Sequence, residues 1–383
     1  MITPSRWPIA GFYACYFAVI GVWIPYWPLY LTNLGYGAET IGLLTALTQW
    51  IRIPGPPLWG RLADRTSRHT VIIFSCFAAF AAFCLFFFGS GLLWVVMATI
   101  LYSIFHTGPL SLTDATAMEL SSQRHWDYGK LRLWGSWGFI LFSLGVGPLT
   151  DWGGMGFVPI TIALLLLGNA FFTLWLPRSN PVVKSETPVP HLFARPDTRW
   201  FYGSALLMQF SHGGYYGFMS LHLQHQGYSL TAIGLLWAIG VFAEVGLMIL
   251  SGRLLARFGV LRMLTFSLLM AALRWSLYSI TIELSVLIVA QLLHAFTFAA
   301  FHIASVRRVH EIASIQERAT AQGWLAALSY GAGGGLGMAI SGLLFNRMGY
   351  EAMFFLMSLA ALFGVMASHR AMILFQRQEH LHV

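Results

Sequence analysis

Long apolar runs separated by short polar breaks follow one another along the whole chain. These runs approach the length of about 20 residues that a helix needs to cross about 30 Å of hydrocarbon. Because lipid offers no partners for backbone N–H and C=O groups, such runs must pair these groups internally as α-helices. The pattern predicts an all-α membrane protein with twelve transmembrane helices, at residues 9–32, 40–60, 70–90, 92–116, 131–150, 156–176, 200–224, 232–252, 261–281, 285–306, 321–344 and 352–370.

A repeat divides this pattern into two copies. Residues 29–44 (LYLTNLGYGAETIGLL) reappear as residues 221–236 (LHLQHQGYSLTAIGLL), and the same shift of 192 positions carries the Gly-Arg-Leu at 60–62 onto that at 252–254. Paired membrane halves with a binding site between them are the usual architecture of secondary transporters. The repeat therefore predicts a transporter built from two related six-helix halves.

One segment near the middle of the chain interrupts the apolar pattern. Residues 178–199 contain four prolines and several charged side chains, without an apolar period. This composition is typical of a linker. We therefore expect an N-terminal six-helix half over residues 1–177, a cytoplasmic linker over 178–199 and a C-terminal six-helix half over 200–383.

The composition and the charges agree with a membrane protein. Hydrophobic residues make up 57% of the chain and charged residues 9%, whereas a soluble protein has about 25% charged residues. The net charge of +8 could indicate nucleic acid as a partner, but nearly all loop lysines and arginines fall on one side of the twelve-span arrangement, and Arg347 is the exception. An excess of cations marks the cytoplasmic side. We therefore expect a multi-pass protein of the inner membrane with both termini in the cytoplasm, embedded in the lipid bilayer and not bound to nucleic acid.

The sequence carries no common catalytic motif. A phosphate-binding P-loop, a zinc-binding His-Glu-x-x-His and a Gly-x-Ser-x-Gly nucleophile elbow are all missing. The three cysteines, Cys15, Cys76 and Cys84, lie in apolar runs and read as packing residues. We expect a monomer that is not an enzyme and that needs no cofactor or metal.

The polar stretch after the second predicted helix reads GRLADRTSR and includes Gly60, Asp64, Arg65 and Arg68. It resembles the signature loop of the major facilitator superfamily. The resemblance implies a tight turn at Gly60, an acid at Asp64 that reaches a neighbouring helix terminus, and arginines that hold the cytoplasmic side as a conformational gate. In the second copy Ala256 replaces the acid, so we expect that half to latch less tightly. A generic basic loop would explain the arginines but not Asp64.

Ionisable residues inside the predicted spans are candidates for function, because an unpaired charge in hydrocarbon costs several kcal/mol. Asp114 and Arg132 lie near adjoining ends of two successive predicted helices, where they could form either a functional pair or a static salt bridge. For the histidines, an interior hydrogen bond is the preferred interpretation at positions 106, 212 and 302. The depth of Arg52 stays open, since prolines follow it. The full set is Arg52, His106, Asp114, Arg132, His212, Glu244, Arg274, His294 and His302.

The charges of the first half resemble those of the lactose permease family. Arg132 follows Asp114 by eighteen residues, as in the acid–arginine pair that holds sugar in that family. Phe139 occupies the position of its ring-stacking tryptophan. The resemblance implies that all three residues bind substrate.

The second half extends this resemblance. Glu244 corresponds to a substrate-binding glutamate, and Arg274 and His294, twenty residues apart, correspond to an arginine and a histidine of proton coupling. Three residues beyond His294, Thr297 replaces the glutamate that carries the proton in that family.

A nearer resemblance covers almost the whole chain. Residues 127–136 (DYGKLRLWGS), 213–218 (GGYYGF) and 243–245 (AEV) are similar to the phenylpropionate/proton symporter branch of the superfamily. This branch imports aromatic carboxylates together with protons. The resemblance implies uptake of a small aromatic carboxylate such as phenylpropionate.

These features give one working hypothesis. Arg132 or Arg274 fixes the substrate carboxylate by paired hydrogen bonds, and aromatic rings enclose its ring. A proton must accompany the anion, because an interior-negative potential opposes it by about 2.3 kcal/mol per 100 mV. Glu244 is the preferred proton carrier, since burial makes a carboxyl harder to ionise, whereas Asp114 beside Arg132 should stay ionised.

Three alternatives stay open. The same charges fit a proton-coupled symporter of sugars or nucleosides. A drug or metabolite exporter of the same fold would carry a Gly-Pro motif followed closely by two glycines, but here four other residues separate Gly147-Pro148 from Gly153-Gly154. A sensor that does not transport would bind its ligand saturably without accumulating it in vesicles.

Overall fold

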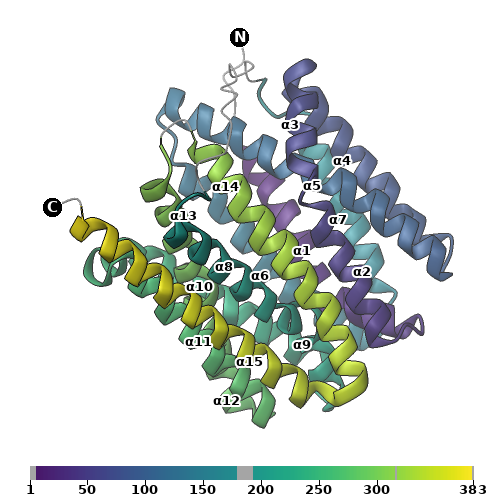
Figure 1. The fold of residues 1–383 in the computed structure, drawn as a ribbon. Helices are drawn as coiled ribbons and strands as arrows, with labels where there is room; N and C mark the ends of the chain where they lie inside the picture. Colours follow the sequence, from purple (N-terminus) through teal and green to yellow (C-terminus); the bar gives the residue numbers. More distant parts are fainter. Residues whose placement is uncertain (1–5, 179–192, 315–316, 382–383) are drawn as a thin grey trace. The chain divides into compact units, whose positions relative to one another are not determined.

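The computed structural model describes residues 6–178, 193–314 and 317–381, and these residues fold almost entirely into helices (Figure 1). No β-strand occurs among them. Eight helices are long and apolar enough to cross a membrane, and a shorter apolar helix covers Phe157–Thr173. The predicted all-α class is confirmed, whereas the count of twelve spans stays a prediction.

The elements follow one another with short connections. In chain order they are α1 Trp7–Asn33, α2 Ala38–Ile51, α3 Gly55–Arg65, α4 Arg68–Cys84, η1 Leu85–Phe87, α5 Leu92–Arg124, α6 Tyr128–Gly153, α7 Phe157–Thr173, α8 Pro196–Ser211, α9 Gly213–His225, α10 Leu230–Phe258, α11 Val260–Ile280, α12 Leu284–Leu292, η2 Ala295–Ala300, α13 Phe301–Ile312, α14 Arg318–Ala326, η3 Ala327–Gly334 and α15 Gly335–Leu381.

Local sequence signals explain where several helices begin and end. The side chain of Asp127 accepts a hydrogen bond from the Lys130 backbone N–H at 3.1 Å and caps the start of α6. His125, in the left-handed conformation with φ of 55°, ends α5 just before it. This tight connection brings the end of α5 close to the start of α6. Pro196 occupies the first turn of α8, where its missing N–H costs nothing.

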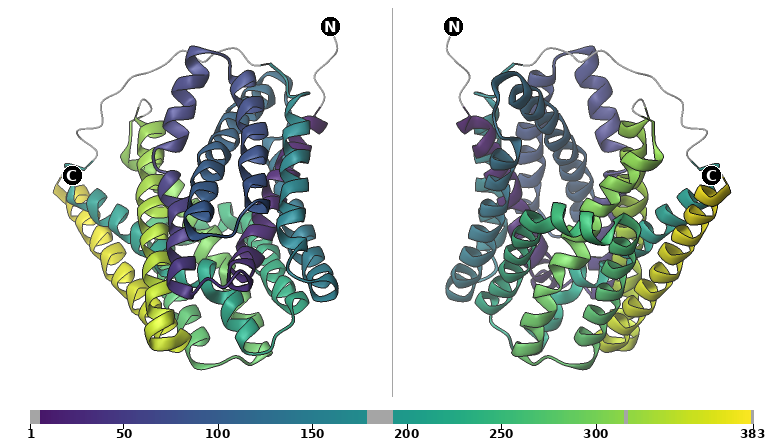
Figure 2. Two further views of the ribbon diagram at one scale, coloured as in Figure 1. Left: turned by 90° about the vertical axis from the view of Figure 1, so that its right-hand side faces the viewer. Right: turned by 90° about the vertical axis from the view of Figure 1, so that its left-hand side faces the viewer.

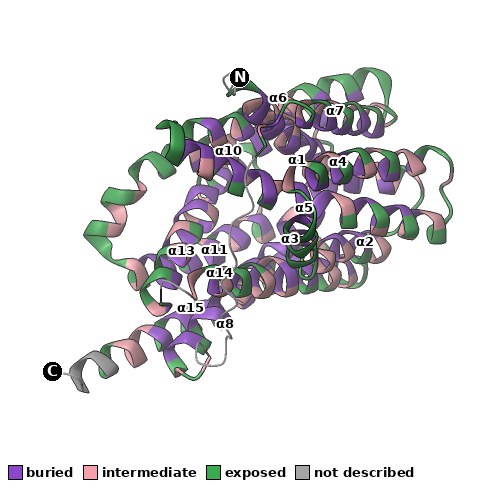
Figure 3. Cartoon of the chain, turned by 90° about the horizontal axis from the view of Figure 1, so that it is seen from above, coloured by how far each residue is buried: buried purple, intermediate pink, exposed green. Residues whose placement is uncertain are grey.

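Some helices bend or break inside the predicted spans. The prolines after Arg52 separate α2 from α3, because proline cannot supply the N–H that an internal helical turn needs. Gly349, with φ of 80°, bends α15 sharply, and Figure 2 shows the two long segments of this helix meeting at that bend. Two π-helical turns, η2 and η3, follow α12 and α14. Beyond Val241, α10 is largely exposed (Figure 3), as expected of a helix surface that faces lipid.

The chain forms two compact units that do not follow the sequence halves strictly. Unit 1 contains Met1–Tyr36, Trp50–Val183 and Gly227–Ala238, and unit 2 contains Gly37–Gln49, Lys184–Gln226 and Ile239–Val383. Within unit 1, α1 packs on α6 and α7, and α4 packs on α5 and α7. Within unit 2, α15 packs on α8, α9 and α11. The predicted halves stay a prediction, and most of the predicted linker lies outside the described residues.

Gly37–Gln49 belongs to unit 2 and Gly227–Ala238 belongs to unit 1, and these two segments occupy equivalent positions in the repeat. Each contains a glycine at which two helices cross closely. In unit 2, a Cβ on Gly42 of α2 would lie 2.7 Å from the Met338 carbonyl oxygen of α15. In unit 1, a Cβ on Gly234 of α10 would collide with the Ser143 carbonyl oxygen of α6. Gly42 and Gly234 are 192 positions apart. Both copies of the repeat therefore have a glycine at a helix crossing where the two backbones are too close for a Cβ atom.

A pair of alanine substitutions on α10 tests this crossing. We expect Gly234→Ala to lower the thermal unfolding midpoint of the detergent-purified protein, because overpacking costs roughly 1–3 kcal/mol. Gly246, on the same helix, has open space around it. Gly246→Ala should keep or raise the midpoint, since alanine is better than glycine in a helix by about 1 kcal/mol. Equal midpoints for the two variants would contradict the close crossing.

Candidate functional site

Arg274 of α11 lies at the centre of a polar cluster inside unit 2, with no exposed surface. Its Nε donates to the carbonyl oxygen of Ala290 at 2.7 Å, and its Nη2 donates to Gln291 Oε1 at 3.0 Å. Its Nη1 faces His294 Nδ1 at 2.8 Å and Thr297 Oγ1 at 3.3 Å. The guanidinium thus uses donors on all three of its nitrogens within the protein.

Aromatic rings cover the same guanidinium. Its central carbon lies 4.0 Å from the Tyr215 ring centroid of α9 and 4.8 Å from the ring of Trp275 beside it in sequence. Ring faces attract a cation, and the attraction is strongest where water is excluded. Rings and neutral acceptors together hold the charge of Arg274 in the apolar interior of the unit.

His294 connects Arg274 to Glu244. The Nε2 atom of His294 lies 2.7 Å from Glu244 Oε1 on α10. A guanidinium can only donate, so His294 Nδ1 must accept from Arg274 and the ring proton must reside on Nε2. The neutral ring then donates to Glu244. The chain Arg274–His294–Glu244 is therefore a directional series of hydrogen bonds, and it unites the three residues of the second half that the sequence singled out.

Several members of the cluster carry no charge, and the sequence analysis missed one of them, Gln291. Gln291 Oε1 accepts from the Tyr215 hydroxyl at 2.9 Å as well as from Arg274. Thr297 Oγ1 also lies 3.3 Å from His212 Nε2, and His212 Nδ1 lies 2.8 Å from the Met208 carbonyl oxygen. The interior hydrogen bond expected for His212 is confirmed. Gln291 was not predicted because only ionisable residues were considered. It lies three positions before His294, and residues at this spacing share one face of a helix, so its position could have indicated it.

In unit 1, Asp114 and Arg132 come close but do not form an ion pair within the described residues. The Oδ1 atom of Asp114 accepts from the Tyr13 hydroxyl at 2.6 Å and from the Tyr128 hydroxyl at 3.1 Å. Arg132 lies over the Phe17 ring at 3.8 Å and over the Tyr13 ring at 5.4 Å. The direct contact between Asp114 and Arg132 that the sequence suggested is therefore wrong. Tyrosine hydroxyls satisfy the acid, and aromatic faces satisfy the arginine.

Phe139 lies on α6, seven positions after Arg132, and is buried. Its backbone packs against α1, where a Cβ on Gly21 would lie 2.6 Å from the Phe139 carbonyl oxygen. The close backbone contact fixes the position of this ring within unit 1. Its assignment as a stacking partner for substrate stays a prediction.

The proposed gate differs from the expected loop. Gly60, Asp64 and Arg65 lie on α3, which continues to Arg65, and a Cβ on Gly60 would meet open space. The tight turn expected at Gly60 is therefore wrong, because the helical pattern continues through it. The chain turns later, at Thr66 and Ser67, where Ser67 caps α4.

Arg68, the first residue of α4, pairs with Glu119 of α5 at 3.2 Å. This pair fixes the start of α4 against α5 inside unit 1. Glu119 was not among the predicted residues, because it lies near the end of a predicted span and its partner is 51 positions away.

A second ion pair concerns a residue that the sequence assigned to the linker. Asp197 is completely buried near the start of α8, and its Oδ2 lies 2.9 Å from Arg308 Nη2 of α13 and 3.0 Å from Arg195 Nη2. Arg308 also reaches Glu311 at 3.3 Å. The end of the predicted linker is therefore a fixed part of unit 2.

Removing the charge of Asp197 tests this anchor. Asp197→Asn would leave Arg308 buried without its main counter-charge, and breaking such a pair costs roughly 3–5 kcal/mol. We expect a large fall in the thermal midpoint. Asp127→Asn is the matched control, because asparagine also caps a helix and Lys130 lies 3.9 Å away in an exposed pair. A similar small effect of both changes would show that Asp197 is not an anchor.

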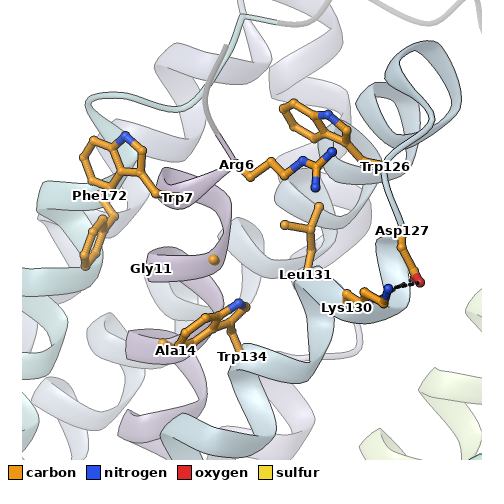
Figure 4. A pocket seen from close by; sticks show the side chains of 11 residues that line it. Arg6, Trp7, Gly11, Ala14, Trp126, Asp127, Lys130, Leu131, Trp134 and Phe172 are labelled. Atoms are coloured by element: carbon orange, nitrogen blue, oxygen red, sulfur yellow. Dashed lines mark hydrogen bonds and ion pairs between the residues drawn. The ribbon is translucent and has the colours of Figure 1, made fainter.

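A groove on unit 1, with a volume of about 620 Å³, opens between the N-terminal ends of α1 and α6 (Figure 4). Trp7 and Trp134 line it and are each about half exposed, at 47% and 53%. Arg6 lies over the Trp126 ring at 5.2 Å. Exposed tryptophans beside cations are typical of the membrane–water interface. Asp114 and Arg132 do not line this groove, so it is distinct from their cluster.

Comparison with known proteins identifies the family. The sequence profile of a family described as the MFS_1 like family matches residues 6–356. The chain belongs to this family. It is 32% identical over 377 residues to a probable 3-phenylpropionic acid transporter of Escherichia coli (strain K12), with 94% of this chain and 96% of the relative covered. It is also 26% identical to a maltose permease of Geobacillus stearothermophilus, with 93% of this chain and 91% of that protein covered.

A solved structure places this MFS_1 like protein among known folds. The crystal structure of the nucleoside transporter NupG superposes with a TM-score of 0.81 at 18% identity, covering 97% of this chain and 98% of that one. The fold is therefore that of the major facilitator superfamily. Family and fold together show a multi-pass membrane protein that transports small molecules.

Proposed function

We propose that this transporter carries a small aromatic carboxylate into the cell together with a proton. The observation that carries the proposal is the hydrogen-bonded chain Arg274–His294–Glu244 in the interior of unit 2. The relative of 32% identity, described as a probable 3-phenylpropionic acid transporter, supports the substrate class.

Glu244 is the carboxyl best suited to take up and release the proton. Two carboxylates, Glu244 and Asp197, are buried within the described residues. Asp197 faces two arginines within 3.0 Å, so protonating it would leave their charges without a counter-charge. Glu244 has a neutral imidazole as its nearest partner. It can therefore change its charge at a smaller cost than Asp197 can.

Protonation of Glu244 changes the charge balance around Arg274. With Glu244 ionised, the cluster holds one negative and one positive charge. With Glu244 protonated, only the positive charge of Arg274 remains, and the hydrogen bond from His294 loses the assistance of the charge. An anion entering the membrane interior is then attracted to this charge, because Coulomb interactions are strong at low dielectric constant. The proton and the carboxylate thus favour each other's binding, as symport requires.

We further propose the finer topology expected from the sequence, with twelve spans in two six-helix halves and both termini in the cytoplasm. The bend of α15 at Gly349 supports it, since the two segments match the expected spans 321–344 and 352–370. The break between α2 and α3 falls inside the expected span 40–60. The protein works as a monomer in the inner membrane.

Transport assays in proteoliposomes test the role of Glu244. With an inward proton gradient, the wild type should accumulate labelled 3-phenylpropionate above equilibrium. Glu244→Gln mimics the protonated state, so it should keep exchange of internal for external substrate but lose accumulation driven by the gradient. Glu283→Gln, which changes an exposed carboxyl at the start of α12, should behave as the wild type.

Two results would count against the proposal. Wild-type accumulation by Glu244→Gln would remove Glu244 as the proton carrier. Accumulation of maltose or of a nucleoside, with no uptake of 3-phenylpropionate, would favour the sugar or nucleoside symporter that other relatives suggest.

A further inference from the structure

Arg52 occupies an unusual place in unit 1. It lies at the break between α2, which has 14 residues, and α3, which has 11. At about 1.5 Å per residue, each helix separates Arg52 from its far end by roughly 15–20 Å. Arg52 is therefore near the middle of this predicted membrane crossing. An arginine at such depth is a candidate for function, because its charge is expensive to hold in the membrane interior.

Arg52 makes no direct contact that balances its charge in the part of the chain that the structure describes. Among the described residues, no hydrogen bond, ion pair or ring contact involves its side chain, and this side chain is exposed. The other arginines named in the sequence analysis of the spans are held: Arg132 stacks on Phe17, and Arg274 donates from all three nitrogens. Arg132 donates no hydrogen bond either, but its face lies on Phe17; of the three arginines, Arg52 alone contacts neither an acceptor nor a ring among the described residues.

A stack of aromatic rings from α1 and α5 lies beside the break that carries Arg52. Gly55, three positions after Arg52, packs against Thr107 of α5, the neighbour of His106, and a Cβ on Gly55 would collide with the Thr107 side chain. The imidazole of His106 stacks on Tyr16, with centroids 4.5 Å apart and planes 4° apart, and on Tyr102 at 5.0 Å and 28°. Trp23 extends the stack beyond Tyr102 at 5.0 Å. Phe12 stacks on Tyr16 at 5.7 Å and 21°, so the stack holds the His106 ring in a fixed position between its neighbours.

His106 contributes a second, independent sign of a missing ligand. Its side chain is 5% exposed, and its Nε2 atom is buried without a hydrogen-bond partner. The interior hydrogen bond expected for His106 is therefore wrong for this atom. A buried polar atom without a partner costs roughly 1–3 kcal/mol. Such a cost is explained if a ligand supplies the partner when it binds.

We propose that Arg52 and His106 bind the carboxylate of the transported anion. The proposal rests on the function proposed above and names the site in unit 1 that recognises the anion. A guanidinium can donate two parallel hydrogen bonds to a carboxylate, and a protonated Nε2 on His106 adds a third. The ligand class is an aromatic ring joined by a short chain to a carboxylate.

Binding measurements with a charged and a neutral ligand test this site. The probes are 3-phenylpropionate and its neutral amide, 3-phenylpropanamide, titrated calorimetrically into detergent-purified protein. The wild type should prefer the acid. Arg52→Ala should weaken binding of the acid by about 10- to 100-fold, the loss typical of hydrogen bonds to charged groups, and leave binding of the amide nearly unchanged. Retained binding of the amide also shows that the variant is folded.

Further variants separate the parts of the site. Arg52→Lys should restore part of the affinity for the acid, because lysine keeps the charge but cannot form the paired hydrogen bonds. His106→Phe keeps a stacking ring but removes Nε2, and should weaken binding of the acid by about tenfold. Arg257→Ala, which removes an exposed arginine near the end of α10, should bind both probes as the wild type does.

The outcomes distinguish the two proposals. If the wild type binds neither 3-phenylpropionate nor related aromatic acids, the proposed function fails and the carboxylate site fails with it. If the wild type binds the acid and Arg52→Ala binds it equally well, only the inference about Arg52 and His106 is overturned. An equal loss of acid and amide binding in Arg52→Ala also overturns it, since that result indicates a structural role.

Discussion

A positive charge inside an apolar unit determines the arrangement of the surrounding helices. A guanidinium can only donate hydrogen bonds, so the protein must supply acceptors and ring faces for Arg274. The acceptors come from Ala290 and Gln291 of α12 and from the following residues His294 and Thr297. The segment from α12 into η2 is held against α11 by these bonds. A π-helical turn, η2, starts directly after His294. Such turns are frequent at functional sites.

The same requirement fixes the chemistry of Glu244. Because Arg274 donates to one side of His294, the other side of the ring must donate to Glu244. The neutral His294 ring is polarised by Arg274 and donates a hydrogen bond to Glu244. It does not place a positive charge directly against the Glu244 carboxyl. We therefore propose that Glu244 takes up and releases a proton without breaking the packing around it. A direct Arg274–Glu244 ion pair would have held the acid ionised and unable to carry a proton.

Unit 1 satisfies its charges in another way. Asp114 is held by two tyrosine hydroxyls and Arg132 by the face of Phe17. Among the described residues, the ion pairs of unit 1, such as that of Arg68 with Glu119, do not include Asp114, Arg132 or Arg52, and we propose that Arg52 stays available for an anion. Within this account, unit 2 provides the proton carrier and unit 1 provides the recognition of the anion.

Much of this site could be predicted from the sequence, because charge is rare in apolar spans. This rule, with the resemblance to the lactose permease family, located Glu244, Arg274 and His294, which the structure brings into contact. It could not predict that Tyr13, 101 positions from Asp114, would bond that acid in place of Arg132. Asp197 was assigned to the linker because the prolines of residues 178–199 break the apolar pattern. The burial of Asp197 beside Arg308 depends on the fold and could not be predicted from this pattern. The repeat predicted the equivalence of Gly42 and Gly234, but not the backbone contacts that each of them makes.

The most direct test of the account is to observe the proton on Glu244. An infrared difference spectrum, recorded on adding 3-phenylpropionate to the purified protein near neutral pH, reports the C=O stretch of a protonated carboxylic acid and its shift in D₂O. The account predicts that this band appears in the wild type and in Asp114→Asn, and that it is absent from Glu244→Gln. A band that persists in Glu244→Gln would show that another group takes up the proton and would contradict the account.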